Sequence, residues 1–326
     1  MTTNYALLFP GQGSQRVGML GEMAEKYSLV SETFKEASEI LGFDLWKLAS
    51  AGPEEKIRQT EFTQPLMLAS GVASGRLWLE LVDEKPSVVA GHSVGEIAAL
   101  VVAGALSFDD SVRLVKERSR LMSAAVPAGK GGMAAVIGMD DADVVALCAE
   151  VTDSLKQSHP GIVVEAVNFN APGQVVISGH LEGIEAVTAL GPERGARKVM
   201  QVPVSVPNHS SLMQVAGETL GKTIDTVSWV KPTIPVMQNQ NAKVAANADD
   251  LVATLRLHVQ SPVLWVQSVE SMVADFKVSK FVEMGPGKVL AGLGKRIDRS
   301  VETVPVFDPD SLGSAIDSLS LSCAQA

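Results

Sequence analysis

The chain has 326 residues, 46% of them hydrophobic, and a formal net charge of −10 at pH 7. The excess of negative charge argues against a nucleic-acid partner, because phosphate binding depends on clustered lysine and arginine. The uncharged run from Ile97 to Phe108 is shorter than the ~20 residues that cross a bilayer, and no signal-peptide pattern follows Met1. We therefore expect a cytoplasmic protein without membrane contact, with one large core or two domains.

The first element is a short apolar strand, Tyr5 to Phe9, which runs directly into the loop Pro10-Gly11-Gln12-Gly13-Ser14-Gln15. A loop at this place is either an ordinary strand-to-helix connection or one wall of a site. Helical patterns follow at Met19–Leu41, Leu45–Leu48 and Thr60–Leu81. Pro65 lies near the start of the last of these, where proline is tolerated.

Residues Val88 to Glu96 contain the pentapeptide Gly91-His92-Ser93-Val94-Gly95 between an apolar strand and a helix-compatible run. This is the G-x-S-x-G elbow in its usual setting. Its glycines occupy a turn too tight for side chains, and the turn lifts the serine hydroxyl clear of the sheet. The alternative is a Gly-Ser-Gly turn without chemistry. The flanking strand and helix favour a nucleophile, with helix N–H groups facing charge that develops beside Ser93.

The next helix, Asp109 to about Ala125, follows the cap-like sequence Ser107-Phe108-Asp109-Asp110. At 100° per residue, Arg118 falls in the middle of the apolar stripe, whereas the other charges share a different face. The neighbours of Arg118 on that stripe are Leu114, Val115, Leu121 and Met122. Because a guanidinium cannot shed its charge, its burial requires an anionic partner. The alternatives are a structural ion pair and a side chain that reaches the surface.

From Gly131 the order of elements becomes β-α-β-β-α-β, which is a ferredoxin-like unit. We predict strands at Met133–Gly138, Ile162–Asn168, Gln174–Ser178 and Arg197–Val206, and helices at Asp141–Val151 and Leu181–Leu190. This unit, residues 129–203, interrupts a larger domain formed by residues 1–128 and 204–326. The predicted fold class is therefore α/β, with an α/β-hydrolase-like large domain on a parallel sheet and an inserted ferredoxin-like small domain.

His209 directly follows the last strand of the insertion, where α/β enzymes place side chains that face a cleft. It is either a general base for Ser93 or a capping or buried histidine. No aspartate between the two follows a strand of the large domain, so the Ser, Asp, His order of α/β hydrolases is not supported. We expect a Ser-His pair oriented by a backbone carbonyl, and His92 pointing away from its serine neighbour.

The remaining patterns are a helix near Ser210–Leu220, a strand near Thr233–Met237, a helix at Asp249–His258 and a strand at Lys280–Met284. The tail from Asp308 is predicted to be peripheral. Cys148 and Cys323 have no metal-ligand spacing, so we expect no metal site.

Taken together, these elements resemble the malonyl-CoA:acyl carrier protein transacylases and the related acyltransferase domains of polyketide and fatty acid synthases. The resemblance covers nearly the whole chain, and its seven motifs occur in the order of the family. They are Phe9–Gln15, Gly91–Glu96, Val112–Val115 leading to Arg118, Val167–Gln174, Val206–His209, Ser261–Val263 and Glu283–Leu290.

The resemblance implies that Ser93 is the nucleophile, that His209 is its base, and that Arg118 binds the free carboxylate of a malonyl group. It also implies an oxyanion hole formed by the N–H groups of Gln12 and Val94, where Val94 replaces a frequent leucine. We carry substrate binding over to Gln12 and to His258, although this sequence departs from the family at His258, where the family often has glutamine. A role of the His258 carbonyl would survive this difference, whereas a side-chain role would not.

The implied function is transfer of malonyl from malonyl-CoA to the phosphopantetheine thiol of acyl carrier protein, for fatty acid biosynthesis, by a monomer without metal or redox cofactor. Alternatives are a trans-acting acyltransferase of polyketide synthesis, a malonyltransferase associated with malonate decarboxylase, a serine hydrolase and a noncatalytic carrier-docking subunit. We expect the carrier to dock in the groove between the domains through basic residues, namely Arg194, Arg197, Lys198, Lys288, Lys295 and Arg296.

Overall fold

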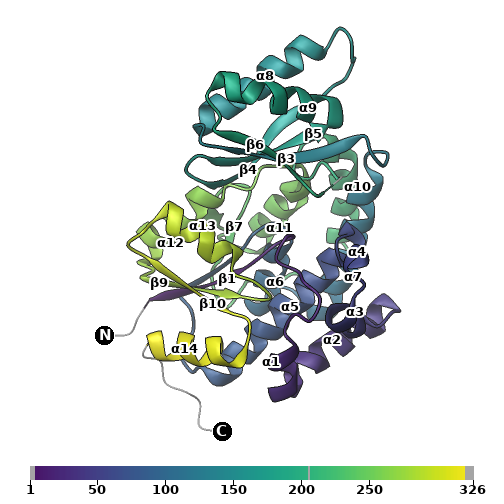
Figure 1. Cartoon of the computed structure of the whole chain (residues 1–326). Coiled ribbons are helices and arrows are strands. Elements are labelled where there is room, and N and C mark those ends of the chain that lie inside the picture. Colours follow the sequence, from purple (N-terminus) through teal and green to yellow (C-terminus); the bar gives the residue numbers. More distant parts are fainter. Residues whose placement is uncertain (1–3, 205, 320–326) are drawn as a thin grey trace.

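The computed structural model describes residues 4–204 and 206–319, so Cys323 lies outside the described residues. Figure 1 shows a small domain above a larger one. In the described residues the large sheet has six strands in the order β10-β9-β1-β2-β7-β8, parallel except for the pair β7–β8. These strands are β1 Tyr5–Phe9, β2 Val88–Gly91, β7 Val236–Gln238, β8 Lys243–Val244, β9 Lys280–Met284 and β10 Glu302–Val306.

Helices cover both faces of this sheet (Figure 1). Before the small domain they are α1 Gly21–Lys26, α2 Ser28–Leu41, α3 Leu45–Ala51, α4 Glu54–Ile57, α5 Thr60–Leu81, α6 Val94–Val102 and α7 Phe108–Ala124. After it come η2 Ser211–Met213, α10 Gln214–Ile224, α11 Ala248–Leu257, η3 His258–Gln260, α12 Trp265–Phe276, α13 Val289–Ile297 and α14 Pro309–Leu319.

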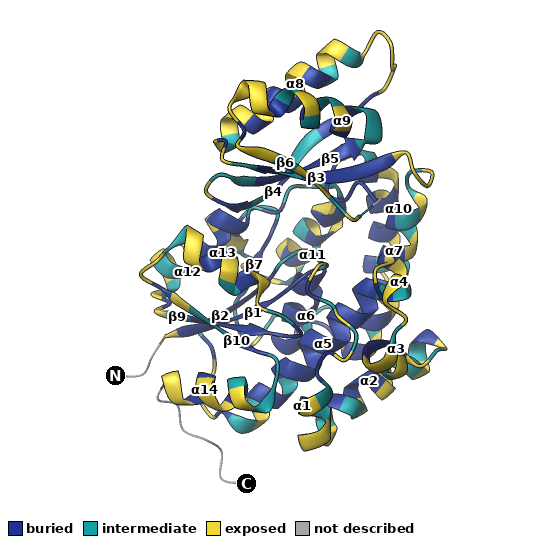
Figure 2. Cartoon of the chain, in the orientation of Figure 1, coloured by how far each residue is buried: buried dark blue, intermediate teal, exposed yellow. Residues whose placement is uncertain are grey.

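Strand alternation divides the core of the large domain in two. Successive side chains of a strand point to opposite faces, so Tyr5, Leu7 and Phe9 join a large cluster with α2, α5, α6 and α7. Ala6 and Leu8 face the other side and pack with α12 and α13. Figure 2 shows the resulting buried interior of this domain. The parallel strands bring the ends of β1, β2, β7 and β9 to one edge of the sheet, where α/β folds bind ligands.

The small domain has an antiparallel sheet of four strands among the described residues, in the order β4-β5-β3-β6. Its elements are β3 Gly131–Ile137, α8 Asp141–Leu155, β4 Val164–Ala171, β5 Gln174–His180, α9 Leu181–Leu190, η1 Gly191–Arg194 and β6 Lys198–Val202. The β-α-β-β-α-β order confirms the ferredoxin-like prediction, and these elements lie within residues 129–203. The boundary residues themselves stay a prediction.

The two faces of the small sheet have different partners. One face packs on α8 and α9 and forms the core of the small domain. The other face contributes Met133, Val167 and Val176, with Val202 and Val204 packed against them. The domains are joined by hydrogen bonds at β4, since Phe169 N–H donates to the Val263 carbonyl and Val263 N–H donates to the Val167 carbonyl.

The structure corrects two predictions about helices. The pattern from Met19 to Leu41 is two helices, because Tyr27 is extended at φ −129° between them. Both helices present apolar residues to the same core, so the apolar pattern does not reveal the break. The tail from Asp308 is not peripheral, because α14 buries an amphipathic stripe in the main cluster. That stripe consists of Leu312, Ala315, Ile316 and Leu319.

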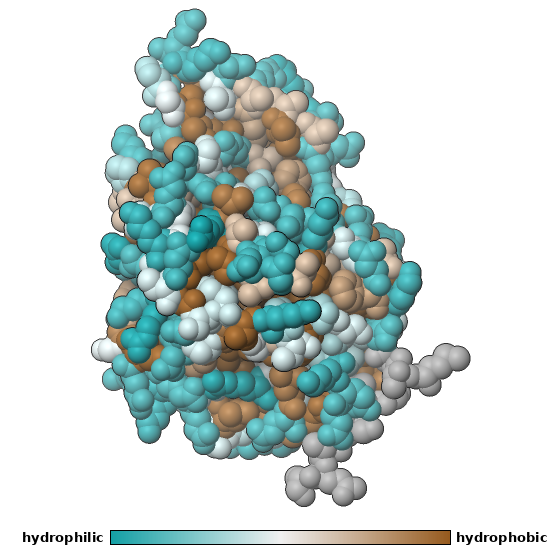
Figure 3. All heavy atoms as spheres, turned by 180° about the vertical axis from the view of Figure 1, so that it is seen from behind, coloured by the Kyte–Doolittle hydropathy of each residue, from teal (hydrophilic) through white to brown (hydrophobic). Residues whose placement is uncertain are grey.

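Among the described residues, none of the helices combines the length and the apolar character that a membrane span requires. On the reverse face of the molecule, Figure 3 shows hydrophobic residues interspersed with hydrophilic ones.

Candidate active site

Ser93 lies at the sharp turn between β2 and α6, as the elbow motif predicts. Its backbone has φ 53° and ψ −118°, a conformation that side-chain-bearing residues rarely adopt. A Cβ on Gly91 would lie 2.0 Å from the Gly95 carbonyl carbon, and a Cβ on Gly95 would lie 2.1 Å from the Phe9 oxygen. Both positions therefore require glycine for the turn to close against the end of β1.

His209 reaches this serine. Its Nε2 lies 2.7 Å from Ser93 Oγ, and its Nδ1 lies 3.0 Å from the His258 carbonyl oxygen and 3.1 Å from that of Ser261. Because carbonyl oxygens only accept, Nδ1 carries the proton and Nε2 is free to take the one on Ser93. The predicted serine-histidine pair oriented by a backbone carbonyl is the observed geometry.

The route of the chain to His209 differs from the prediction. Strand β6 ends at Val202 and belongs to the small sheet, so His209 does not directly follow a strand. The backbone of His209 itself has φ 66°. Its backbone N–H donates to the Val259 carbonyl at 3.1 Å. Contacts with the segment that contains η3 therefore fix His209, rather than the end of a strand.

His209 is 2% exposed. Burial lowers the pKa of its imidazole to about 3, with further lowering by the charge of Arg118 and by His92, against the opposing effect of the two carbonyl contacts. A base with a lowered pKa stays neutral when the pH falls through 6.5. His209 is therefore in the proton-accepting form at neutral pH.

This lowered pKa predicts the pH dependence of acylation. We expect kcat/KM for acyl transfer to keep its neutral-pH value well below pH 6.5, because His209 loses its basic form only near its own pKa. The measurement is kcat/KM against pH under brief incubation. An acid limb centred near the ordinary histidine value of about 6.5 would contradict this assignment.

The pH dependence of kcat/KM needs a control for loss of folded protein at low pH. His258 is also buried, and burial lowers the pKa of its imidazole well below the ordinary value. Unfolded histidines bind protons below about pH 6.5 that the two buried ones do not, so the free energy of unfolding decreases as pH falls. Circular dichroism at each pH separates this loss from the catalytic limb.

Arg118 comes from α7 and is 1% exposed. Its Nη1 donates to Gln64 Oε1 at 2.5 Å, and its Nη2 donates to Ser93 Oγ at 3.2 Å. Its Nε has no hydrogen-bond partner within residues 4–204 and 206–319. Burial lowers the pKa of the guanidinium to about 10, opposed by the charge of Glu96, so it remains protonated at pH 7. The helix phase thus correctly predicts a buried cation, which lies beside the nucleophile.

His258 lies close to His209 and to Glu96. Its carbonyl oxygen orients His209, while its ring is 2% exposed and lies with Nε2 3.7 Å from Glu96 Oε2. Burial raises the pKa of Glu96 to about 8, against the opposing effects of the Asn239 N–H and of the charge of Arg118, and burial lowers the pKa of His258. The carbonyl of His258 thus has the orienting contact that survives the difference from the family, and substrate binding by His258 stays a prediction.

The two residues with the predicted N–H donors, Gln12 and Val94, lie near Ser93. Val94 is the first residue of α6, where a helix provides no acceptor for the N–H. Gln12 follows β1 in a loop and lines a cavity together with Ser93. Its side-chain Nε2 lies 3.4 Å from Thr60 Oγ1. Their positions suit an oxyanion hole, and this role stays a prediction.

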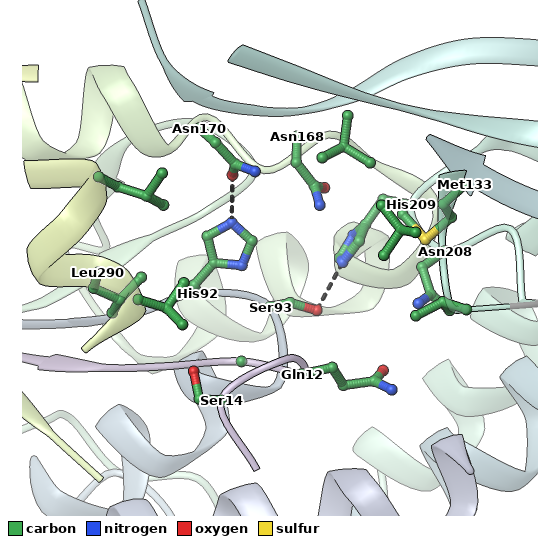
Figure 4. Close-up of a pocket in the computed structure, with 16 residues that line it drawn as sticks. Gln12, Ser14, His92, Ser93, Met133, Asn168, Asn170, Asn208, His209 and Leu290 are labelled. Atoms are coloured by element: carbon green, nitrogen blue, oxygen red, sulfur yellow. Dashed lines mark hydrogen bonds between the residues drawn. The ribbon is translucent and has the colours of Figure 1, made fainter. Parts of the chain in front are cut away.

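A cavity of about 190 Å³ opens in front of Ser93, between the end of the large sheet and the apolar face of the small sheet. Its residues are Gly11, Gln12, Ser14, His92, Ser93, Met133, Asn168, Asn170, Val176, Val202, Val204, Asn208, His209, Val289, Leu290 and Leu293. In Figure 4, Ser93 points toward His209, and His92 turns away to Asn170, with 2.7 Å between His92 Nε2 and Asn170 Oδ1. Both domains therefore contribute apolar side chains to the cavity, and polar side chains surround the reacting serine, including Asn168 and Asn170 of the small-domain strand β4.

Two residues at this site are absent from the sequence prediction. Gln64 is fully buried on α5 and holds Arg118, and Asn239 is fully buried after β7 and contacts the elbow backbone. A polar side chain inside an apolar helix and an asparagine at a strand end are the signals that point to them. Neither signal identifies the partner.

The fold and the Ser93–His209 geometry define a class of enzymes that move acyl groups through a serine ester. The sequence profile described as acyl transferase domain matches residues 6–313, and the chain belongs to this family.

Relatives cover the chain almost completely. The malonyl CoA-acyl carrier protein transacylase of Escherichia coli K12 is 44% identical over 315 residues, which are 97% of this chain and 99% of that protein. The crystal structure of an acyl carrier protein S-malonyltransferase from Vibrio cholerae is similar, with a TM-score of 0.90, 45% identity and coverage of 96% and 100%. A malonyl-transacylase solved with its type II polyketide acyl carrier protein has a TM-score of 0.92 at 40% identity, with coverage of 97% and 100%.

Proposed function

We propose that this chain transfers malonyl from malonyl-CoA to the phosphopantetheine thiol of an acyl carrier protein through a malonyl ester of Ser93. The names of the relatives support the donor and the acceptor. The observation that carries the proposal is the buried guanidinium of Arg118, 3.2 Å from Ser93 Oγ. A malonyl group has a carboxylate that can pair with this cation beside the serine, whereas an uncharged acyl group such as acetyl has none.

The position of Arg118 suits a short diacid. In a malonyl group one methylene separates the carboxylate from the thioester carbonyl carbon, so a carboxylate stays within a few ångströms of the serine oxygen that the carbonyl carbon joins. Nη1 is committed to Gln64, whereas Nε is unpartnered in the described part of the chain and Nη2 contacts the reactive hydroxyl. Two nitrogens therefore remain to hold a carboxylate through parallel hydrogen bonds.

Acylation follows from these contacts. Ser93 Oγ attacks the thioester carbonyl carbon while His209 Nε2 takes its proton, and the carbonyl oxygen becomes an oxyanion facing the N–H groups of Val94 and Gln12. The carbon–sulfur bond then breaks, and the coenzyme A sulfur takes the proton from His209. The products are malonyl-Ser93, the free thiol and neutral His209.

The second half-reaction repeats these steps in reverse with a different thiol. The carrier thiol gives its proton to His209 and attacks the ester carbonyl carbon, and the bond to Ser93 Oγ breaks as the serine regains the proton. The proposed steps use protein groups alone, so independence from a metal or redox cofactor is part of the proposal. A role in fatty acid biosynthesis is proposed from the relatives, and action as a monomer stays a prediction.

The test of the function measures the products from malonyl-CoA with and without carrier proteins. Malonyl-carrier formed in preference to free malonate supports transfer. Release of malonate at the same rate without a thiol acceptor would instead indicate a serine hydrolase. Comparing a fatty acid carrier with a polyketide carrier tests the pathway, since the relatives include a transacylase solved with a type II polyketide carrier.

The structure refines the basic surface proposed for carrier docking. Lys198 is exposed on β6, whose Val202 lines the cavity, and Lys288 is exposed beside the cavity residue Val289. Arg296 instead joins the domains through Gln174 and the Pro172 carbonyl, and Arg194 pairs with Glu150 at 2.5 Å.

We expect Lys198→Glu with Lys288→Glu to slow transfer to carrier on the order of 3- to 30-fold at low salt, because exposed charges act on association rate. The measurement is kcat/KM for carrier at low and high salt, and the difference should shrink as salt screens the charges. Lys35→Glu, on the exposed side of α2, is the matched control. An unchanged rate in the double variant at low salt would show that this surface does not meet the carrier.

A further inference from the structure

Asn239 joins two backbone groups of the elbow with its side chain. Its Oδ1 accepts the Ser93 N–H at 2.7 Å, and its Nδ2 donates to the Gly91 carbonyl at 2.6 Å. The side chain is fully buried. Both ends of one amide are thus committed to the residues on either side of His92.

The place of Asn239 in the sheet explains this contact. Parallel pairing between β2 and β7 ends at the pair Ala90–Met237. Beyond that pair the chain turns away from β7 at the elbow, so the backbone of β7 cannot form hydrogen bonds with the Gly91 carbonyl and the Ser93 N–H. The Asn239 amide has the same donor and acceptor as a peptide group and satisfies them instead.

The contact falls on a residue whose backbone conformation is strained. Ser93 has φ 53° and ψ −118°, a conformation that persists only when surrounding contacts enforce it. The orientation of the amide follows from its partners, because the Ser93 N–H requires an acceptor and the Gly91 carbonyl requires a donor. A reversed amide would place like groups against each other at both ends.

Asn239 also contacts the support of the base. Its Oδ1 lies 3.4 Å from His258 Nε2, and the His258 carbonyl accepts from His209 Nδ1. Its backbone N–H donates to Glu96 Oε2 at 2.7 Å, and Glu96 lies on the helix that follows the serine. One buried residue thus connects the backbone of the nucleophile with the residue that orients its base.

We propose that Asn239 is a positioning residue that holds Ser93 in its reactive conformation and in register with His209. The proposal rests on the proposed function only in taking Ser93 as the nucleophile. Asn239 touches neither substrate nor the reacting atoms, and it acts through the backbone of Ser93. Its loss should therefore lower the rate of acylation and leave the binding of the acyl donor nearly unchanged.

The neighbouring residue provides a matched control. Gln238 is also a buried amide, at 1% exposed, and its Nε2 donates to the Leu251 carbonyl at 3.1 Å, away from the elbow. Asn239→Ala and Gln238→Ala each remove a buried amide, so both should lower the melting temperature. Only the first removes contacts to the serine.

Two readouts separate positioning from stability. For Asn239→Ala we expect kcat of malonyl transfer to fall roughly 10- to 100-fold with KM changed less than about threefold, as expected when an interaction acts on the reactive geometry. The rate of Ser93 labelling by a fluorophosphonate should fall in parallel, since this reagent needs the serine but no malonyl carboxylate. Gln238→Ala should retain kcat and the labelling rate within about threefold.

Asn239→Leu is the second variant, because leucine keeps the branched shape of the side chain while it removes both the acceptor for the Ser93 N–H and the donor to the Gly91 carbonyl. We expect it to lose roughly tenfold or more in labelling rate at neutral pH. If the wild-type protein reacted with the fluorophosphonate but did not transfer malonyl, the proposed function would be wrong. The labelling rates of the variants would still test the positioning role of Asn239. Labelling and kcat that fall equally in Asn239→Ala and Gln238→Ala, or that remain unchanged in both Asn239 variants, would overturn the positioning role.

Discussion

Replacing Ser93 with alanine should abolish the covalent malonyl adduct and lower malonyl transfer on the order of 10,000-fold or more. The reason is geometric, because Ser93 Oγ is the oxygen that His209 Nε2 contacts, at 2.7 Å, and that Arg118 Nη2 contacts, at 3.2 Å. Without this oxygen, the remaining groups can bind malonyl-CoA and the carrier protein but cannot form the serine ester. The measurement is the transfer rate, together with mass analysis of the protein after a brief incubation with malonyl-CoA.

Circular dichroism provides the folding control for Ser93→Ala, because alanine must adopt the same φ of 53°. His209→Ala keeps the hydroxyl and removes its base, so a small residual adduct is expected there at a much lower rate. A Ser93→Ala protein that still acquired malonyl at the wild-type rate would place the nucleophile elsewhere in the chain.

Arg118→Ala should lower kcat/KM for malonyl-CoA by on the order of 30-fold to several thousand-fold. Removing one partner of a desolvated charge pair typically costs about 2–5 kcal/mol, and each ~1.4 kcal/mol is a factor of ten in rate. Transfer of acetyl from acetyl-CoA should fall much less, because acetyl has no carboxylate to leave unpaired. The experiment measures both donors on wild type and variant.

Arg118→Lys tests the geometry of the guanidinium. Lysine keeps the charge but cannot form two parallel hydrogen bonds to a carboxylate. It also cannot donate to Gln64 Oε1 at the same time as it holds a carboxylate in that way. We expect an intermediate loss for malonyl-CoA. Equal losses for malonyl and acetyl donors in Arg118→Ala would show that Arg118 stabilises the fold around Gln64 and that selectivity for the acyl group lies elsewhere.

Local signals in the sequence were sufficient for much of this site. The elbow needs only glycines at two positions, a preceding strand and a following helix, and Ser93 is found as predicted. The helix phase places Arg118 inward because 100° per residue is fixed by backbone geometry. The order of strands and helices in the small domain was likewise readable, since each element has its own period.

Contacts between distant segments could not be read in the same way. His209 is held by carbonyls of His258 and Ser261, which lie about fifty residues further along the chain. Asn239 meets the elbow only because β7 pairs with β2. Gln64 meets Arg118 only because α5 packs on α7. Sequence periodicity contains no information about which strands are neighbours or which helices pack, so these partners emerge only with the fold.

The most direct test of the central claim follows malonyl through the protein by intact-mass analysis and peptide mapping. After brief incubation with malonyl-CoA, we predict one malonyl group per chain on the peptide that contains Ser93, and its loss when holo carrier protein is added, with malonyl appearing on the carrier. Malonyl-carrier formed while Ser93 remains unmodified throughout, or an adduct that the carrier does not discharge, would contradict transfer through a serine ester.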